Sequence, residues 1–404
     1  MNYKDNNKIM LKPFIVDCPT NKFLKKVIFG KYQVIKTIGK SAFSSVFLGK
    51  CLNEKKYVAI KIQSKNANIS PLEKEAYYQF LLKGLGIPKI ITFGRSGRFN
   101  ILVETLLGKT VKQLFKLNKN PQKKMKDMCL TAIQIIDRIE YIHSKNIVHQ
   151  DIKPENFLVG NPDTTIIYII DFGLSKKYRS SRTGKHIAFS LNKRFNGSLN
   201  FSSVNSMRGA ELSRRDDLES IGYMLIYLVN DGLPWSSYEK GQISERFGKI
   251  FSLKANIKNE ELCKGFPSEM CDYMNYVKSL KFEENPNYIY LRKLFISILD
   301  KMNEKYDLKF SWVKGKGINK KNTSLMSSLN GLRGRSPFFK LLYNIKEKSI
   351  IKSINTDINK IEKEEIKKNS LLFSKIKTYN FINQRCISNG HFGFNKSNLI
   401  KEKE

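Results

Sequence analysis

Four polar residues in two nearby segments have the types and order that transfer of a phosphoryl group requires. Residues 149–157, "HQDIKPENF", contain Asp151, Lys153 and Asn156, and the later "DFG" begins with Asp171. This chemistry depends on positioning and charge neutralisation more than on covalent help. We expect Asp151 to orient or deprotonate a substrate hydroxyl while Lys153 steadies the transferred phosphate. Carboxylate and amide oxygens suit Mg²⁺, so Asn156 and Asp171 are the predicted metal ligands.

The segment "VAIKIQ" supplies a candidate lysine for nucleotide phosphates. Strand alternation places Ala59 and Lys61 on one face, where Ala59 would meet a flat base and Lys61 the α- and β-phosphates. Such a lysine needs an anionic partner, and the next helix offers Glu73 and Glu75. Residues two positions apart on a helix face different ways, so only one of them can reach Lys61. We predict Glu75, since Glu73 lies near the helix N-terminus, where the dipole favours its charge.

The elements that must position these residues change along the chain from strands to helices. Between residues 31 and 108, short β-rich runs surround one helix, which Ser70 is expected to cap and Gly84 to end. Further on, "CLTAIQIIDRIEYIHSK" and "DDLESIGYMLIYLVNDG" have helical patterns, and "TTIIYIIDFG" is a buried strand ending in a glycine turn. The sequence therefore predicts an α+β fold with a β-rich first part and a mainly helical second part.

Several further motifs are similar to those of one enzyme family. They are "YIHSKNIVH", "DIKPENFLVG", "DFGLSKKYR", "SRRDDLES", "LPW", "LCKGFPSE" and "PNYIYLRKLF". With them, residues 29–312 resemble the eukaryotic protein kinases and, within these, the casein kinase I family. "SSVN" at 202–205, where most kinases carry Ala-Pro-Glu, also resembles that family. The resemblance implies a bilobal kinase fold, ATP with Mg²⁺, and phosphorylation of serine or threonine in acidic or already phosphorylated proteins.

The resemblance also divides the chain into parts. Residues 1–28 are expected to form an N-terminal extension. The kinase domain is expected at 29–314, with an N-terminal lobe at about 29–108 and a C-terminal lobe at about 109–314. Residues 315–404 are rich in Lys, Asn, Ser and Ile, which predicts a basic, largely disordered tail.

The glycine-rich loop of the family departs from its usual form in this chain. "GKSAFSSV" keeps Gly39 and Val46 but has Ser41 and Ser44 in place of two glycines. Glycine lets the backbone approach phosphate closely, whereas serine is small and still donates hydrogen bonds, so we expect weaker ATP binding rather than none. The residues expected to bind ATP are Ile38, Gly39, Lys40, Ser41, Ala42, Phe43, Ser44, Ser45, Val46, Ala59, Lys61, Glu75 and Leu106.

Two further departures concern single residues. A gapless match puts Glu104 where the family has an apolar gatekeeper beside the adenine, and a buried carboxylate there is costly unless it is paired. A local shift by one residue is the alternative, and we favour it. Gln150 replaces the arginine that usually pairs with a phosphate on the activation segment, which predicts activity independent of that phosphorylation.

The resemblance places a substrate anion pocket at two basic residues, Lys193 and Arg246. A third matching position is Asn200, where the family has arginine, so one bidentate phosphate contact is missing. We expect weaker dependence on phosphate-primed substrates, with acidic residues still favoured.

Composition limits the other functions. The net charge is +36, but no motif for reading nucleic-acid grooves accompanies it, so nucleic acid is not expected as the main partner. There is no apolar run long enough to span a bilayer. We expect a monomer without membrane association, located in the cytoplasm, the nucleus or both. The rival interpretations are a pseudokinase that acts as a binding scaffold and a basic nucleic-acid-binding protein that uses this fold.

Overall fold

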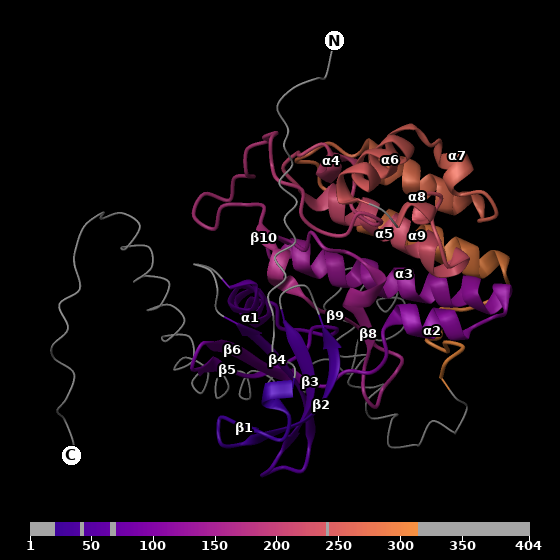
Figure 1. Cartoon of the computed structure of the whole chain (residues 1–404). Helices are drawn as coiled ribbons and strands as arrows, with labels where there is room; N and C mark the ends of the chain where they lie inside the picture. Colours follow the sequence, from indigo (N-terminus) through magenta and orange to yellow (C-terminus); the bar gives the residue numbers. More distant parts are fainter. Residues whose placement is uncertain (1–20, 41–43, 65–69, 240–241, 314–404) are drawn as a thin grey trace, which may run out of the picture. The chain divides into compact units, whose positions relative to one another are not determined.

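A strand-rich N-terminal region and a helical C-terminal region make up the described part of the chain. The computed structural model describes residues 21–40, 44–64, 70–239 and 242–313. Within them, a six-stranded antiparallel sheet has the order β1-β2-β3-β4-β6-β5. The fold is mixed α+β, as predicted, and Figure 1 shows the sheet below the helices. The strands of the sheet are β1 (Val27–Ile28), β2 (Tyr32–Lys40), β3 (Ser45–Cys51), β4 (Tyr57–Ser64), β5 (Ile90–Ser96) and β6 (Phe99–Thr105).

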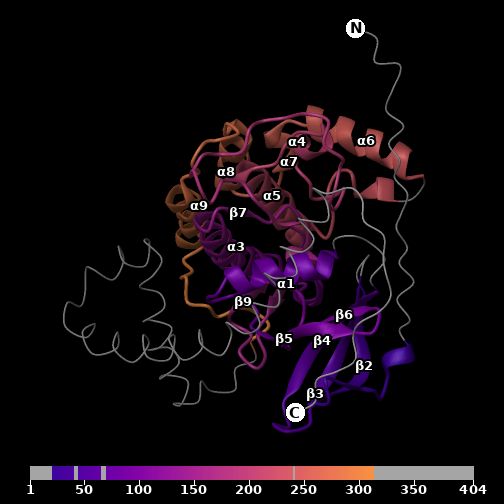
Figure 2. The same cartoon turned by 90° about the vertical axis from the view of Figure 1, so that its left-hand side faces the viewer.

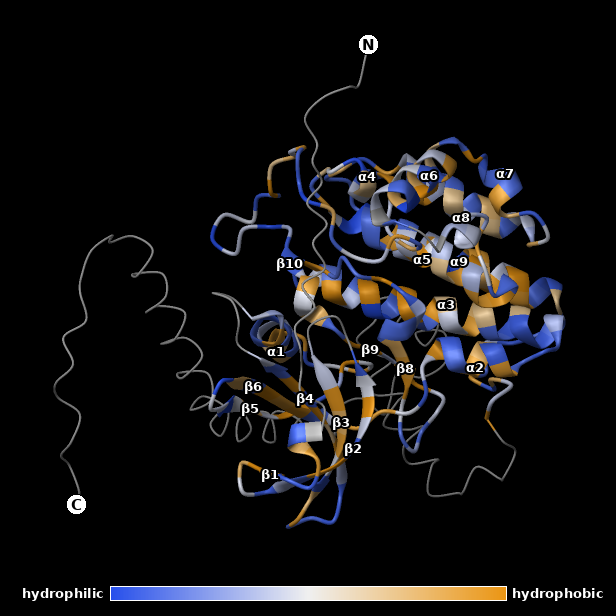
Figure 3. Cartoon of the chain, in the orientation of Figure 1, coloured by the Kyte–Doolittle hydropathy of each residue, from blue (hydrophilic) through white to orange (hydrophobic). Residues whose placement is uncertain are grey.

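The two faces of the sheet have different roles. Val58, Ile60 and Ile62 of β4 join an apolar cluster on one face, as the alternation predicts. The middle of β6 is strongly hydrophobic over consecutive residues, since both of its faces are covered (Figure 3). Phe23 and Ile28 are buried in the same cluster. The expected boundary at residue 29 therefore falls inside the folded region. The predicted tail lies outside the described residues.

Helix α1 (Pro71–Leu81) covers the other face of the sheet. Its Leu72 and Ala76 pack against Leu102 of β6. Ser70 precedes the helix in an extended conformation, but its side chain accepts no bond from the first turn; the amide of Leu72 donates instead to the side chain of Gln63 at 3.0 Å. The helix ends three residues before the predicted stop at Gly84. In Figure 2, α1 lies between the sheet and the helical region.

Buried helices form the core of the C-terminal region. Helix α3 carries the predicted apolar face, and α5 is buried along most of its length. In the part of the chain that the structure describes, no helix is long and apolar enough to cross a bilayer. The helices of this region are α2 (Val111–Leu117), α3 (Pro121–Ser144), α4 (Val204–Met207), α5 (Arg214–Asn230), α6 (Ile243–Asn256), α7 (Asn259–Leu262), α8 (Ser268–Ser279) and α9 (Tyr288–Lys301).

Short strands and 3₁₀ turns between α3 and α4 carry the polar residues singled out from the sequence. Strand β8 pairs with β9, and β7 pairs with β10, so the segments 149–157 and 171–174 are held between two small ladders. These elements are β7 (Ile147–Val148), η2 (Pro154–Asn156), β8 (Phe157–Val159), β9 (Ile167–Ile169), η3 (Phe172–Leu174) and β10 (Lys176–Lys177).

Candidate active site

A buried carboxylate from α5 holds the backbone of the loop at 149–157. The Asp217 carboxylate accepts hydrogen bonds from the amide nitrogens of His149 (2.7 Å) and Gln150 (2.8 Å). It also lies 2.9 Å from Nε2 of His143 on α3. Burial opposes its ionisation, but the contacts with His143 and His149 together outweigh burial and hold the pKa of Asp217 below its ordinary value. A charged anchor therefore fixes the loop without any phosphate on the chain.

Asp151 is fixed through one of its two carboxylate oxygens. Its Oδ2 accepts from Nζ of Lys153 at 2.5 Å and from Nδ2 of Asn156 at 3.2 Å. Its Oδ1 is buried and has no hydrogen-bond partner among the described residues. Gly197 approaches this oxygen, because a Cβ built there would lie 3.8 Å from it. The loop thus presents one oriented acceptor oxygen that no described residue pairs.

Asn156 and Asp171 lie on neighbouring backbone segments and carry donor oxygens of the kind that a divalent cation prefers. The backbone nitrogen of Ile170 donates to the carbonyl of Asn156 at 3.0 Å, which brings Asp171 next to Asn156. The Asn156 amide nitrogen donates to the carbonyl of Asp151 at 2.8 Å, so the amide oxygen keeps its lone pairs for another partner. A carboxylate and an amide oxygen are suitable donors for Mg²⁺. The pair could hold the ion and neutralise phosphate charge beside Asp151.

Lys61 lies on the α1 side of the sheet and makes the expected ion pair with Glu75. Its Nζ is 2.5 Å from Oε1 of Glu75, and both residues are buried. Burial favours the neutral amine, but nearby carboxylates, chiefly Glu104 and Glu75, outweigh it and raise the pKa of Lys61. Glu73 instead pairs with Arg95 of β5 at 2.7 Å, near the surface. Of the two glutamates, the structure therefore joins Glu75 to the lysine.

Glu104 corrects one expectation of the sequence analysis. The favoured shift by one residue is wrong, because β6 pairs with β4 in a continuous register in which Glu104 lies opposite Ala59 and Leu102 opposite Lys61. Opposed residues of an antiparallel pair share a face, so the carboxylate points to the Lys61 side. It is buried, 3.0 Å from Nζ of Lys61, and accepts a hydrogen bond from Gln79 at 2.7 Å. The costly buried charge is thus paired.

The described residues expected to bind nucleotide gather around Lys61. In the register of β2, β3 and β4, Gly39 lies opposite Val46, and Val46 lies opposite Lys61. Ile38 and Lys40 also lie on β2, Ser45 on β3 and Ala59 on β4; Ser44 immediately precedes β3 and Leu106 follows β6. Ser41, Ala42 and Phe43 lie outside the described residues.

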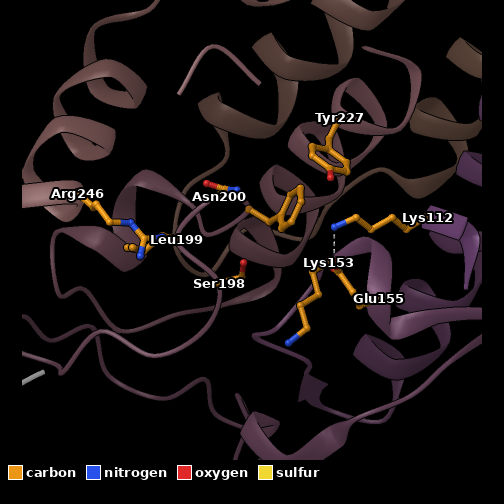
Figure 4. Close-up of a pocket in the computed structure, with 9 residues that line it drawn as sticks. Lys112, Lys153, Glu155, Ser198, Leu199, Asn200, Tyr227 and Arg246 are labelled. Carbon is orange, nitrogen blue, oxygen red and sulfur yellow. Dashed lines mark hydrogen bonds and ion pairs between the residues drawn. The ribbon is translucent and has the colours of Figure 1, made fainter. Parts of the chain in front are cut away.

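A cavity of about 420 Å³ opens beside the loop at 149–157. It brings Arg246 of α6 and Asn200 together with Lys153 (Figure 4). Lys193, the other predicted anion-pocket residue, does not line this cavity, and its Nζ is 3.2 Å from Glu211. The residues that line the cavity are Lys112, Lys153, Glu155, Ser198, Leu199, Asn200, Phe201, Tyr227 and Arg246.

Sequence reasoning assigned no site role to several residues that support this cavity, the loop at 149–157 or the surroundings of Lys61. Lys254 of α6 is fully buried and donates to the carbonyls of Leu199 (2.8 Å) and Ser202 (2.7 Å). Burial lowers its pKa to about 7. Asp217 lies in the "SRRDDLES" motif, which indicated the family but not the contact of Asp217 with the amides of His149 and Gln150. Gln79 has no sequence signature, since its role depends on the register of β6.

The comparison with known families agrees with the geometry. A family model, protein kinase domain, matches residues 32–302, which is more than half of the 404-residue chain. That match spans strands β2 to β6 of the sheet, α1, the loop that carries Asp151, and the helices through α9. The chain therefore belongs to the protein kinase family.

Proposed function

We propose that the protein is an ATP-dependent serine/threonine kinase of the casein kinase I type, which transfers the γ-phosphate of ATP to hydroxyls of acidic proteins. One observation carries this proposal. Asp151 is held by Lys153 and Asn156 through one oxygen, while its other oxygen has no hydrogen-bond partner among the described residues. A fixed carboxylate with one unpaired oxygen is suited to orient a hydroxyl for in-line attack.

The other residues supply charge where phosphate would bind. Lys61, held by Glu75, would bind the α- and β-phosphates. Asp171 and Asn156 would hold Mg²⁺, which neutralises the charge of the phosphates. Lys153, 2.5 Å from Asp151, would stabilise the phosphate at the point where the hydroxyl attacks. These roles match the recurring parts of kinase sites, in which catalysis is mostly positioning and electrostatic stabilisation.

Activity without activation-segment phosphorylation is part of the proposal. Gln150 has no charge to pair with a phosphate, and its backbone is already held by the Asp217 carboxylate at 2.8 Å. The loop therefore needs no phosphate to order it. The motifs "LCKGFPSE" and "SSVN" support the casein kinase I type.

Acidic substrates are favoured by the charges beside the loop. Arg246 and Lys153 line the same cavity, where they would attract a carboxylate or phosphate of a bound protein. Asn200 replaces an arginine in this cavity, so the bidentate contact that a phosphate prefers is missing. We propose that acidic residues are sufficient and that a priming phosphate adds little.

The second candidate is a pseudokinase scaffold, which binds partners or nucleotide without efficient catalysis. Two observations favour it. Ser41 and Ser44 replace glycines of the phosphate loop, and Glu104 adds a second carboxylate 3.0 Å from the nitrogen of Lys61. Both changes weaken attraction for ATP phosphates. The intact set of Lys61, Asp151 and Asp171 opposes this candidate.

Transfer from labelled Mg-ATP to casein and to an acidic serine peptide tests the proposal. The same peptide with tyrosine at the acceptor, and one with its acidic residues changed to alanine, serve as controls. We expect transfer to casein and the acidic serine peptide, little to either control, and none by an Asp151→Asn variant that still folds. Equal transfer by wild type and the variant, or none by either, would exclude Asp151 as the catalytic acceptor.

A further inference from the structure

A second polar contact ties α1 to the sheet, beside the ion pair between Lys61 and Glu75. Glu104 contacts Lys61 through Oε1 at 3.0 Å, and its Oε2 accepts from Nε2 of Gln79 at 2.7 Å. Gln79 follows Glu75 by four positions on α1, so both side chains lie on one face of the helix. Lys61, Glu75, Gln79 and Glu104 thus form a polar ring, closed through the backbone of α1.

The polar ring is buried, which makes its contacts depend on one another. Each of its four residues is at most 5% exposed. Burial raises the pKa of Glu75, although the Lys61 ammonium opposes this. One ammonium faces two carboxylates, and the amide of Gln79 supplies the additional donor that Glu104 requires. In a buried network, loss of one member leaves a polar group unpaired, which costs more than an exposed contact would.

Gln79 is itself fixed from outside the polar ring. Its Nε2 also donates to the carbonyl of Pro88, just before β5, at 2.9 Å. The amide is therefore oriented by a backbone group, and its position does not depend on Glu104 alone. If α1 moved away from the sheet, the contacts of both Glu75 and Gln79 would break. With an apolar residue at 104, the same movement would break the contacts of Glu75 with Lys61 and of Gln79 with Pro88, but none with residue 104.

We propose that Glu104 and Gln79 are positioning residues, which hold α1 where Glu75 reaches Lys61 in the absence of a phosphate on the activation segment. The proposal rests on the proposed kinase function and adds to it. It also explains the carboxylate of Glu104. Its charge weakens the attraction of Lys61 for ATP phosphates, but it also holds Lys61 and α1 in the positions where Lys61 contacts Glu75.

Hydrogen exchange of the α1 amides tests the proposal in the nucleotide-free, full-length protein. Gln79→Met removes the contacts to Glu104 and to the carbonyl of Pro88 but leaves the one between Glu104 and Lys61. Glu104→Met removes the contacts of Glu104 with Lys61 and Gln79 and gives position 104 an apolar side chain. We expect amide exchange in α1 to become about tenfold faster in each variant. Glu73→Gln, which cuts the exposed pair with Arg95 on the same helix, is the control and should change exchange less than twofold.

Steady-state kinetics distinguish a positioning role from a merely structural one, because only a positioning role predicts a lower kcat with an unchanged KM for the peptide. In both variants kcat should fall about tenfold, while KM for the peptide stays within about twofold, because the cavity beside the loop is untouched. The double variant should lose less than the sum of the two single losses, since both substitutions cut the contact between Glu104 and Gln79.

The outcomes separate this proposal from the kinase function. If wild type transfers no phosphate but Gln79→Met still speeds α1 exchange, the polar ring stands and the kinase function fails. The proposal is overturned if Gln79→Met leaves α1 exchange and kcat unchanged. It is also overturned if the two substitutions act additively on kcat, or if Glu104→Met raises kcat with α1 still protected.

Discussion

Two lysine–carboxylate pairs carry the proposed chemistry, and they are built in different ways. Lys153 and Asp151 lie on one loop, whose backbone is fixed by Asp217. Lys61 and Glu75 come from a strand and a helix, and the direct contacts beside the pair are made by the side chains of Glu104 and Gln79. The loop pair therefore owes its geometry to backbone hydrogen bonds. The pair in the sheet owes it to the packing of α1 and to strand register.

Removal of the backbone anchor should have the largest effect. Asp217→Ala leaves the buried amides of His149 and Gln150 and the ring of His143 without their acceptor. We expect the free energy of unfolding to fall by about 3 kcal/mol and phosphate transfer to be lost. Urea unfolding measures the first effect and labelled-ATP transfer the second. Asp272→Ala, on the exposed side of α8, is the control and should stay within about 0.5 kcal/mol.

Acid provides a second test of the same anchor. The pKa of Asp217 is below its ordinary value in the folded protein, so its contribution to stability is complete above the unfolded pKa of about 3.9. That contribution is lost as pH falls through the lower folded value. Wild type should therefore lose stability more steeply than Asp217→Asn below about pH 4. Parallel stability curves for the two proteins would show that Asp217 is not the anchor.

Crowding the backbone of the loop at Gln150, next to Asp151, should damage the loop pair without touching the sheet. Gly197 has φ +108°, and a Cβ there would lie 3.2 Å from the carbonyl oxygen of Gln150. We expect Gly197→Ala to lower kcat about tenfold, with KM for ATP unchanged. Gly184 also has positive φ (+66°) but open space around it, so Gly184→Ala separates backbone strain from crowding. Equal losses in the two variants would count against the role of Gly197.

Loss of the hydrogen bonds that hold the segment at 199–202 should weaken binding of the protein substrate more than binding of ATP. Lys254→Met removes the donors to the carbonyls of Leu199 and Ser202, which border the cavity. We expect KM for an acidic peptide to rise about tenfold and KM for ATP to stay within about twofold. An equal rise in both constants would show that the segment at 199–202 also controls the nucleotide side.

The smallest expected effect concerns the missing arginine. Asn200→Arg restores a guanidinium to the cavity that Arg246 lines. We expect the preference for a phosphoserine-primed peptide over its acidic counterpart to rise about fivefold. The ratio of kcat/KM for the two peptides measures it. A strong preference for the primed peptide in wild type would contradict the proposed use of acidic substrates.

The difference between the two pairs also explains what could be predicted from the sequence. Asp151, Lys153 and Asn156 lie within six residues, so their spacing indicated one site and the structure brings them together. The alternation of β4 and the choice of Glu75 followed from local periodicity. The place of Glu104 depends on how β6 pairs with β4, which a single sequence does not encode locally. The partnership with Gln79, which depends on the same register, could not be predicted either.

The rate of phosphate transfer as a function of Mg-ATP concentration tests the central claim most directly. It should be measured for wild type, Lys61→Met and Asp151→Asn, with binding of Mg-ATP measured in parallel. Our account predicts a saturating rate for wild type, a higher KM for ATP in Lys61→Met, and normal ATP binding with at least about 100-fold lower kcat in Asp151→Asn. Wild type that binds Mg-ATP to saturation and transfers no phosphate would contradict it and favour the scaffold.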